Sequence, residues 1–525
     1  MIQPMVGQSS VRLWLLPITL MICVSAVPVF AQEKPGTTVR RYNGPGSCSA
    51  SACHGGAQIA AKTTRDQTRT HIWQNEYFIW ATQDPHFKAF TTLQADRSKK
   101  ISQLLNRSTS PEQDPQCLGC HALAPQRPMQ ARLFAPEGVS CENCHDASSA
   151  WFENHFQRDS TTAKSIEFGM YPIRDSVQRS TKCLSCHMGT EKYDVDHQMI
   201  AAGHPDLFFE LDLFSAKMPR HWATPNELNQ DFKDVAKDPN YEVRLWAVGQ
   251  AVQLHTALDR LAWRAERAQH PAPGQLPKWP ELSELDCFSC HHSVNSNWLD
   301  PNYDRFAANS HPRSFDSWRQ KRGYEGRDPG SPPWNSAHFT IFRVLLKIID
   351  REDSENLKTK LHDLYQVASK LNSSPKDVGQ KAQDAARFAA GLVEKVANEF
   401  KNTSSESKKP ILRQIMLEIS AEADSIANQD TRSAEQAYMA LDSLFRSYDG
   451  IKTGERLDTG AHRYVGSAIE ALYKQFDNPS AYDAPDFAKA LRNIHNALLS
   501  DVAVKQPSQG GITRKLQVRQ PYSAN

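Results

Sequence analysis

The sequence predicts a mainly α-helical protein with little regular sheet, in which a region rich in cysteine and histidine is followed by an up-and-down bundle of helices. Two observations lead to this fold class. Apart from Cys23, every cysteine of the 525-residue chain lies between Cys48 and Cys290. After Trp334 cysteine and tryptophan disappear, and apolar residues recur with the helical period instead. The length favours two or three domains.

Residues 1–31 have the pattern of a secretory signal peptide that is cleaved off. Arg12 precedes the apolar stretch LWLLPITLMICVSAVPVF, and VFA then supplies small residues for a cleavage site. Pro17 and Pro28 fit a membrane span poorly, so we expect cleavage rather than anchoring, and loss of Cys23 with the leader. No other stretch approaches the ~18–20 apolar residues of a membrane helix. We therefore expect an exported, periplasmic protein with no membrane span in its mature chain.

The cysteines that remain form five pairs, and a histidine directly follows each pair. Four pairs have the spacing C-x-x-C-H, whereas CSASACH separates its two cysteines by four residues. The cysteines are Cys48 with Cys53, Cys117 with Cys120, Cys141 with Cys144, Cys183 with Cys186, and Cys287 with Cys290; the histidines are His54, His121, His145, His187 and His291.

The C-x-x-C-H pattern is typical of covalent haem attachment, because two thioethers fix the porphyrin and the next residue brings an imidazole to the iron. A disulfide framework or a zinc ribbon would explain the pairs but not the histidine after each one. We therefore predict five haem c groups, held by these ten cysteines and by the five histidines as proximal ligands. At Cys48 and Cys53 the small intervening residues allow a longer loop, and a local disulfide is the alternative.

Five irons in electron transfer would need further axial ligands, and several histidines have a suitable context. His86 lies in WATQDPHFKAF, His155 in AWFENHF and His204 in HQMIAAGHPDLFFEL. His255 lies on a helix that we expect from about Tyr241 to Ala268. We select these four histidines as distal ligands. Weaker candidates are His221, His292, His311 and His338.

The phrases GPGSCSASACHGG, DPHFKAF, CLGCHA, GVSCENCHDASSAWFENH, CLSCHMGT, DHQMIAAGHPDLFFEL and LDCFSCHH together resemble multihaem cytochromes c of the cytochrome c-554 type. That group is distantly related to hydroxylamine oxidoreductase and pentahaem nitrite reductase. The resemblance covers roughly residues 43–335. It implies closely stacked haems, an electron-transfer function, and distal roles for His86, His155 and His204.

The chain departs from these relatives in several ways. The type member has four haems, and this chain has motifs for five. Pentahaem nitrite reductases carry a lysine in place of one proximal histidine, whereas every motif here ends in histidine. The tyrosine cross-link and the additional haems of hydroxylamine oxidoreductase cannot be placed. The resemblance thus implies electron transfer more firmly than any substrate.

The C-terminal part of the chain predicts about five or six amphipathic helices. One stretch begins at FTIFRVLLKIID and extends to about Leu371. Further apolar stretches cover 385–396, 411–419, 437–445, 465–473 and 487–499. The expected organisation is a signal peptide over 1–31, a multihaem cytochrome c domain over 32–330, a helical bundle domain over 331–504 and a disordered tail over 505–525.

We interpret the protein as an electron relay between redox partner proteins, and we assign no catalytic residue. The alternative is an oxidoreductase with one open haem iron that acts on a small nitrogen or oxygen compound, so enzyme activity stays undecided. The net charge of +2 without a long basic run gives no indication of nucleic-acid binding. For the bundle we favour a packing role, with docking, haem covering and oligomer formation as alternatives.

Overall fold

The structure is a computed structural model of the chain. It describes residues 40–57, 74–123, 133–157, 159–227, 238–271, 277–290, 331–335, 337–401, 408–451, 455–476 and 482–500. The expected signal peptide, the expected tail and His291 lie outside these residues.

Helices make up the regular structure of the described residues, and this confirms the mainly α fold class. In the same residues the only extended pairing is an isolated antiparallel bridge between Leu285 and Trp334. The cysteine-rich region has short helices: α1 (Glu76–Gln83), α2 (Ala89–Gln94), α3 (Asp96–Leu104), α4 (Pro115–His121), α6 (Cys141–His145), α7 (Thr162–Glu167), α8 (Ser176–His187), α9 (His197–Ala201) and α10 (Leu211–Lys217).

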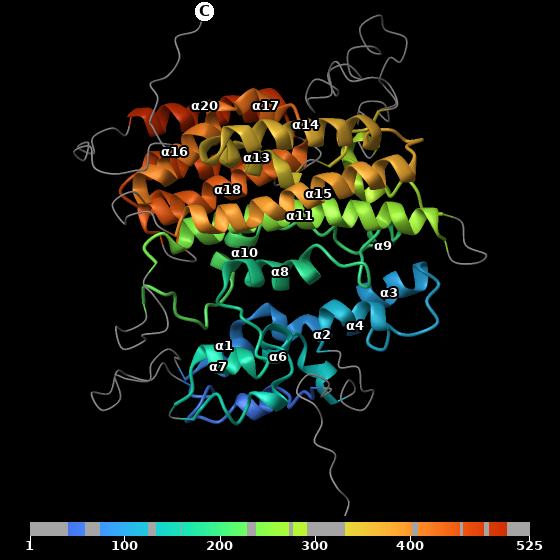
Figure 1. Cartoon of the computed structure of the whole chain (residues 1–525), viewed down its shortest axis with the longest axis vertical. Helices are drawn as coiled ribbons and strands as arrows, with labels where there is room; N and C mark the ends of the chain where they lie inside the picture. The colour runs from blue at the N-terminus through green and yellow to red at the C-terminus, as the bar shows by residue number, and fades with distance from the viewer. Residues whose placement is uncertain are drawn as a thin grey trace, which may run out of the picture. The chain divides into compact units, whose positions relative to one another are not determined.

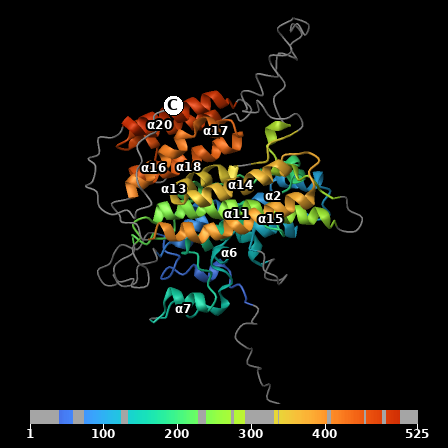
Figure 2. The ribbon, with the colours of Figure 1, turned by 45° about the horizontal axis from the view of Figure 1, so that its top comes forward.

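The long helix α11 (Tyr241–Gln269) agrees with the helix expected from about Tyr241 to Ala268. It packs along α15 (Pro375–Glu399), and the two helices run side by side in Figures 1 and 2. A second contact joins α11 to α10, where a Cβ atom at Gly249 would lie 3.3 Å from Leu211 Cδ2. Glycine at this position therefore lets the two helices approach closely.

The C-terminal part contains eight helices in its described residues, rather than the five or six expected. The expected stretch up to about Leu371 is broken at Asp350, which has an extended backbone and caps the following helix with its carboxylate. The second helix not expected from the sequence is the short α17 (Ala423–Ala427). The helices are α13 (Ala337–Ile349), α14 (Arg351–Ala368), α15, α16 (Lys408–Ala421), α17 (Ala423–Ala427), α18 (Thr431–Asp449), α19 (Arg463–Tyr473) and α20 (Ala484–Ser500).

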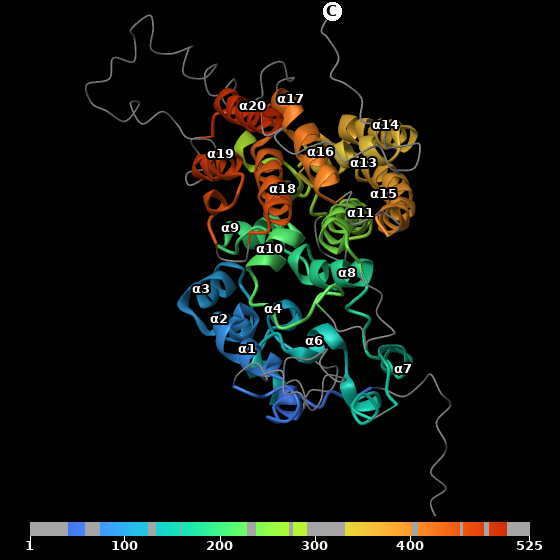
Figure 3. The same ribbon diagram turned by 90° about the vertical axis from the view of Figure 1, so that its left-hand side faces the viewer.

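One hydrophobic core joins α8, α10 and α11 to these C-terminal helices. The buried residues of this core run from Leu184 and Met188 at the end of α8 to Leu498 in α20. Figure 3 shows α8 and α10 next to α11. Helix α10 also contacts α18. This core includes residues on both sides of residue 330. The domain boundary expected there stays a prediction.

Within the described part of the chain, none of the helices has both the length and the apolar composition required to cross a lipid bilayer.

Candidate functional site

The cysteine motifs are numbered in chain order as sites I to V. Site I is Cys48, Cys53 and His54; site II is Cys117, Cys120 and His121; site III is Cys141, Cys144 and His145; site IV is Cys183, Cys186 and His187; site V is Cys287, Cys290 and His291.

Sites II, III and IV are helical, and this places their reactive side chains together. Site II ends α4, site III spans the whole of α6, and site IV forms the last turn of α8. Residues i, i+3 and i+4 share one face of an α-helix, so the two thiols and the imidazole lie on the same side. The carboxylates of Asp114 and Asp175 cap α4 and α8, and at the start of α6 the Ser140 backbone N–H donates to Asn143 Oδ1 at 2.8 Å.

Sites I and V have tighter local structure. Cys48 ends the 3-10 helix η1 (Pro45–Cys48), and Cys287 begins η6 (Cys287–Ser289). The ten cysteines of the five sites are free thiols in the structure. The disulfide alternative for Cys48 and Cys53 is therefore not formed here, and haem attachment at site I stays a prediction.

Three motif histidines lie opposite three of the histidines selected as distal ligands. The distances between ring centroids are nearly the same in the three pairs, although the interplanar angles differ. The pairs are His54 with His155 (6.4 Å, 11°), His121 with His204 (6.3 Å, 90°), and His187 with His86 (6.1 Å, 86°).

This separation tests whether the residues fit a haem iron. A metal–imidazole bond is about 2 Å long, so two imidazoles on opposite sides of one metal have centroids about 6 Å apart. Aromatic rings that pack on one another have centroids about 4.5–7 Å apart, so the observed spacing is compatible with axial ligation but does not require it. The three pairs thus have the spacing of two axial ligands, and the residues fit the group that the motifs imply.

The Nδ1 atom lies within hydrogen-bond distance of an oxygen atom in five of these six residues. Metal-bound histidines nearly always donate their second N–H in this way, because the hydrogen bond fixes both tautomer and ring orientation. The Nδ1 acceptors are Glu76 Oε2 for His54 (3.1 Å), Asp84 Oδ1 for His86 (2.8 Å), Ala89 O for His121 (3.1 Å), Phe152 O for His155, and Pro205 O for His204 (2.6 Å).

Electrostatics divides the histidines into two groups. The hydrogen bond to Glu76 raises the pKa of His54, and at His86 the Asp84 carboxylate outweighs burial and also raises the pKa. Burial lowers the pKa of His187 to about 4. Burial also lowers the pKa values of His121 and His155. His121, His155 and His187, whose pKa values are lowered, are therefore neutral at pH 7, as an iron ligand must be.

Site III has a different neighbour. Burial lowers the pKa of His145 to about 4, and among the charged groups that contribute, His221 has the largest effect. The Nδ1 atom of His221 lies 3.4 Å from Pro219 O. The structure thus brings the weaker candidate His221 into the electrostatic surroundings of site III.

His255 lies on the outward stripe of α11, together with exposed Asp259 and Glu266. The described residues show no ring contact between His255 and a motif histidine, so its distal role stays a prediction. His338, in the first turn of α13, is only 6% exposed, and its Nδ1 has no hydrogen-bond partner in the described part of the chain.

Neighbouring thiols show which sites adjoin. A hydrogen bond with Cys141 of site III lowers the pKa of Cys48 in site I to about 7. In the same way, Cys120 of site II lowers the pKa of Cys186 in site IV to about 7. Site I therefore contacts site III, and site II contacts site IV.

Two further contacts extend this order. Burial and then the thiol of Cys183 raise the pKa of Cys144 to about 12, so site III adjoins site IV. Burial raises the pKa of Cys287, and Asp206 acts in the same direction. Asp206 is two residues beyond His204, the partner of His121. The thiol contacts thus give the order I, III, IV, II. Asp206 relates site V to the surroundings of site II, and Arg260 relates it to site IV by donating to both Glu284 and Met188 O.

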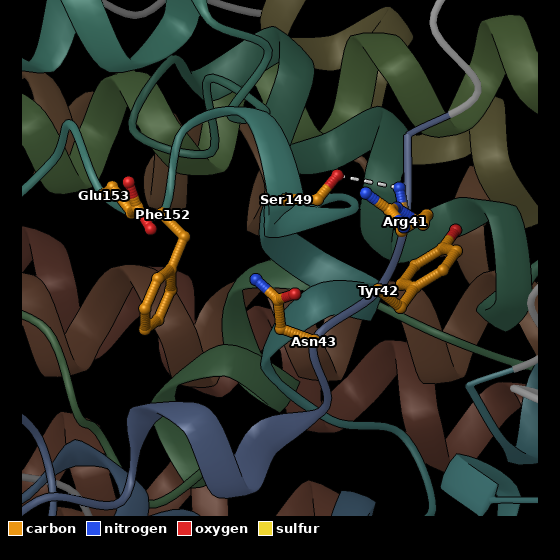
Figure 4. Close-up of a pocket in the computed structure, with 6 residues that line it drawn as sticks. All are labelled: Arg41, Tyr42, Asn43, Ser149, Phe152 and Glu153. Carbon is orange, nitrogen blue, oxygen red and sulfur yellow. Dashed lines mark hydrogen bonds between the residues drawn. The ribbon is translucent and has the colours of Figure 1, made fainter. Parts of the chain in front are cut away.

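A cavity of about 400 Å³ opens beside site I (Figure 4). Its lining residues are Arg41, Tyr42, Asn43, Ser149, Phe152 and Glu153. The Arg41 backbone N–H donates to Ser149 Oγ at 2.8 Å, and Phe152 also packs against the ring of His155. Phe152 therefore separates this cavity from the His54–His155 pair.

The residues that hold the histidines are absent from the predicted site. In DPH, the carboxylate of Asp84 accepts from both the backbone N–H and the Nδ1 of His86, an Asx-type arrangement that a local sequence signal could have revealed. Buried Glu142 of site III accepts from the N–H groups of Asn43, Gly44 and Ser148 and thereby fastens site I to site III. Nothing in the local sequence indicates that long-range contact.

Residues 68–146 match the protein family described as cytochrome c554 and c-prime. The matched segment contains sites II and III and His86. No curated protein and no solved structure matches the chain.

Proposed function

Residues 68–146 are of the cytochrome c-554 type, and from this premise we propose that the protein is an exported electron relay with five covalently bound haems. The observation that carries the proposal is the set of three histidine pairs, each with ring centroids 6.1–6.4 Å apart. Bound haem would supply one-electron chemistry at its iron.

The residues of the chain would hold, orient and enclose that group. In each site the two thiols would attach the haem, and the motif histidine would provide one nitrogen ligand to the iron. For sites I, II and IV, His155, His204 and His86, respectively, would provide the second nitrogen ligand. Two imidazoles around one iron suit electron transfer, because they leave no position for a substrate.

The order I, III, IV, II, with site V related to sites II and IV, supports a continuous route for electrons. Each step in this order joins sites whose own or neighbouring side chains interact. Because attached haem edges start at these cysteines, adjacent thiols imply adjacent haems. Electrons would enter or leave at site I or at the end formed by sites II and V, through redox partner proteins.

Site III is where the alternative function could arise. For an electron relay we propose His221 as the second ligand of the site III iron. If His221 does not bind, this iron has an open position, and the protein would be an oxidoreductase for a small nitrogen or oxygen compound.

Two measurements on the purified holoprotein test the proposal. The intact mass should exceed that of the processed polypeptide by five haem masses, and an excess of four would contradict attachment at site I. The EPR spectrum of the oxidised protein should contain only low-spin signals that nitrite or cyanide leave unchanged. A high-spin signal that responds to either ligand would instead support the oxidoreductase.

A variant then locates any open iron. His221→Ala should create a high-spin signal in a protein that had none before. If the wild type already has that signal and the variant leaves it unchanged, His221 is not a ligand.

A further inference from the structure

The N-terminus of α10 carries a buried carboxyl group that the electron relay described above does not use. Glu210 is 0% exposed and directly precedes Leu211, the first residue of this helix. The helix packs against α8, α11 and α18. Asp212, half-buried, follows on the same turn.

Hydrogen bonds to neutral groups hold Glu210. Its Oε2 accepts from the Leu213 backbone N–H at 2.7 Å, and its Oε1 accepts from Gln250 Nε2 at 2.8 Å. No lysine or arginine donates to it among the described residues. Such a buried carboxyl favours the protonated form. Burial and then the Asp212 carboxylate raise the pKa of Glu210 to about 8.

Two neighbouring helices supply charged groups near Glu210 and Asp212, and a third supplies a neutral hydrogen-bond donor. From α8, Arg179 acts on Asp212 and lowers its pKa, whereas burial, the largest effect, raises that pKa to about 6. From α11, Glu242 contributes a negative charge and is itself paired with Lys408 Nζ at 2.8 Å. From α18, neutral Ser443 donates to Asp212 Oδ2.

Glu210 is also next to the packing partner of site IV. The ring of Phe209 stacks on the ring of His187, with centroids 4.1 Å apart and an interplanar angle of 17°. The Phe209 carbonyl is fixed by Gln253 Nε2 at 2.6 Å and by Gln436 Nε2 at 3.1 Å. Adjacent residues have Cα atoms about 3.8 Å apart, so the backbone of Glu210 directly follows the residue that packs on site IV.

This closeness couples the charges of the two groups. Two charges about 10 Å apart, at an effective dielectric constant of about 20, change each other's ionisation constant by roughly tenfold. A negative charge added at site IV would therefore favour protonation of Glu210. The coupling is reciprocal, because a protonated Glu210 would favour the added electron to the same extent.

We propose that Glu210 is a proton-binding site coupled to reduction of the haem held at site IV. A redox partner supplies the electron, water supplies the proton, and the only bond formed in the protein is the carboxyl O–H bond. Reoxidation returns the proton to solvent. The inference rests on the proposed function, since it requires a haem at site IV.

The test measures haem midpoint potentials between pH 6 and pH 9 in the holoprotein. In the wild type, one potential should fall as the pH rises, by about 59 mV in total, because a tenfold change in an ionisation constant corresponds to about 59 mV for a one-electron step. Glu210→Gln keeps the size and the hydrogen-bond acceptor but cannot titrate, so this pH dependence should disappear. Glu242→Gln is the matched control: it removes an ion-paired carboxylate from the same surroundings and should leave the pH dependence unchanged.

A second measurement needs no variant. The infrared difference spectrum between reduced and oxidised wild type should contain a carboxylic acid band that appears on reduction. An unchanged pH dependence in Glu210→Gln, or the absence of this band, would overturn the proton site. Fewer than five haems by mass would contradict the proposed function instead, so the two failures are distinguishable.

Discussion

At the scale of single residues, the sequence shows which histidines are available but not which ones meet. His54 and His155 are far apart in the chain, and so are His121 and His204, yet the ring centroids of each pair lie only 6.3–6.4 Å apart. Their contexts made His86, His155 and His204 good candidates. Pairing depends on tertiary packing, which a local pattern does not contain.

The carboxylate behind His86 is the first residue to test. Asp84 fixes the Nδ1 of His86, and residues that hold metal ligands in this way typically contribute about 10–100-fold to metal affinity. Asp84→Asn should therefore weaken the His86–iron bond and produce a high-spin fraction at one haem, measured by EPR. Asp96→Asn is the control, because Asp96 is exposed and, among the described residues, its ion pair is the one with Lys99. Equal spectra for the two variants would contradict the assigned role of Asp84.

The second ligand of site V is decided by comparing two histidines. Asn335 N–H donates to Glu284 O at 2.8 Å, and Leu285 bridges to Trp334, so the segment before Cys287 is joined to the start of α13. His338 follows there, buried and without an Nδ1 partner in the described residues. We expect His338→Ala to convert one low-spin haem to high spin, and His255→Ala to leave the EPR spectrum unchanged. The reverse result would make His255 the ligand.

At the scale of elements, regular periodicity was predictable and its interruptions were not. The pattern of α11 is uninterrupted, and the predicted helix agrees with the observed one. The break at Asp350 escaped prediction because apolar residues continue on both sides of it, and the capping carboxylate alone ends the pattern. The contact of α11 with α15 likewise depends on residues more than a hundred positions apart.

Two arginines of α11 fix the segment that leads to site V. Arg260 Nε donates to Glu284 Oε1 at 2.8 Å, and Arg264 Nη1 donates to the same atom at 2.6 Å. All three side chains are at most 9% exposed. Although burial acts in the opposite direction, the two guanidinium groups lower the pKa of Glu284 to about 2.

Removing this carboxylate should be costly, because buried Arg260 would lose its carboxylate partner and buried Arg264 would keep only Asp194 of its two carboxylate partners among the described residues. Glu284→Gln should lower the free energy of unfolding by about 3–5 kcal/mol, measured by urea titration at pH 7. Since the pKa is lowered in the folded state, the stabilisation is complete above about pH 4.5 and is lost as the pH falls towards 2. The difference between variant and wild type should shrink accordingly. Glu355→Gln, in an exposed pair with Lys358, should change stability by less than about 1 kcal/mol.

At the scale of the whole molecule, the order I, III, IV, II makes site IV a bridge. Replacing Cys183 and Cys186 together with serine should remove one haem and separate sites I and III from site II. Reduction by a donor at one end should then become biphasic in stopped-flow absorbance, with one group of haems reduced slowly. The matched control is the double serine variant of Cys287 and Cys290, which removes a haem outside this order. A single phase in both variants would contradict the order.

The continuous core also has a consequence for how the protein is made. Leu184 lies within site IV and Met188 directly follows it, and both pack in the same core as Leu498. This part of the fold cannot close until nearly the whole chain is available. During biosynthesis, residues after 330 are the last to emerge, so the cysteines of site IV would stay accessible to the thioether-forming machinery until then. Late closure would thus provide an interval for cofactor insertion, and a chain truncated before α20 should still accept haem at site IV but should be an unstable product.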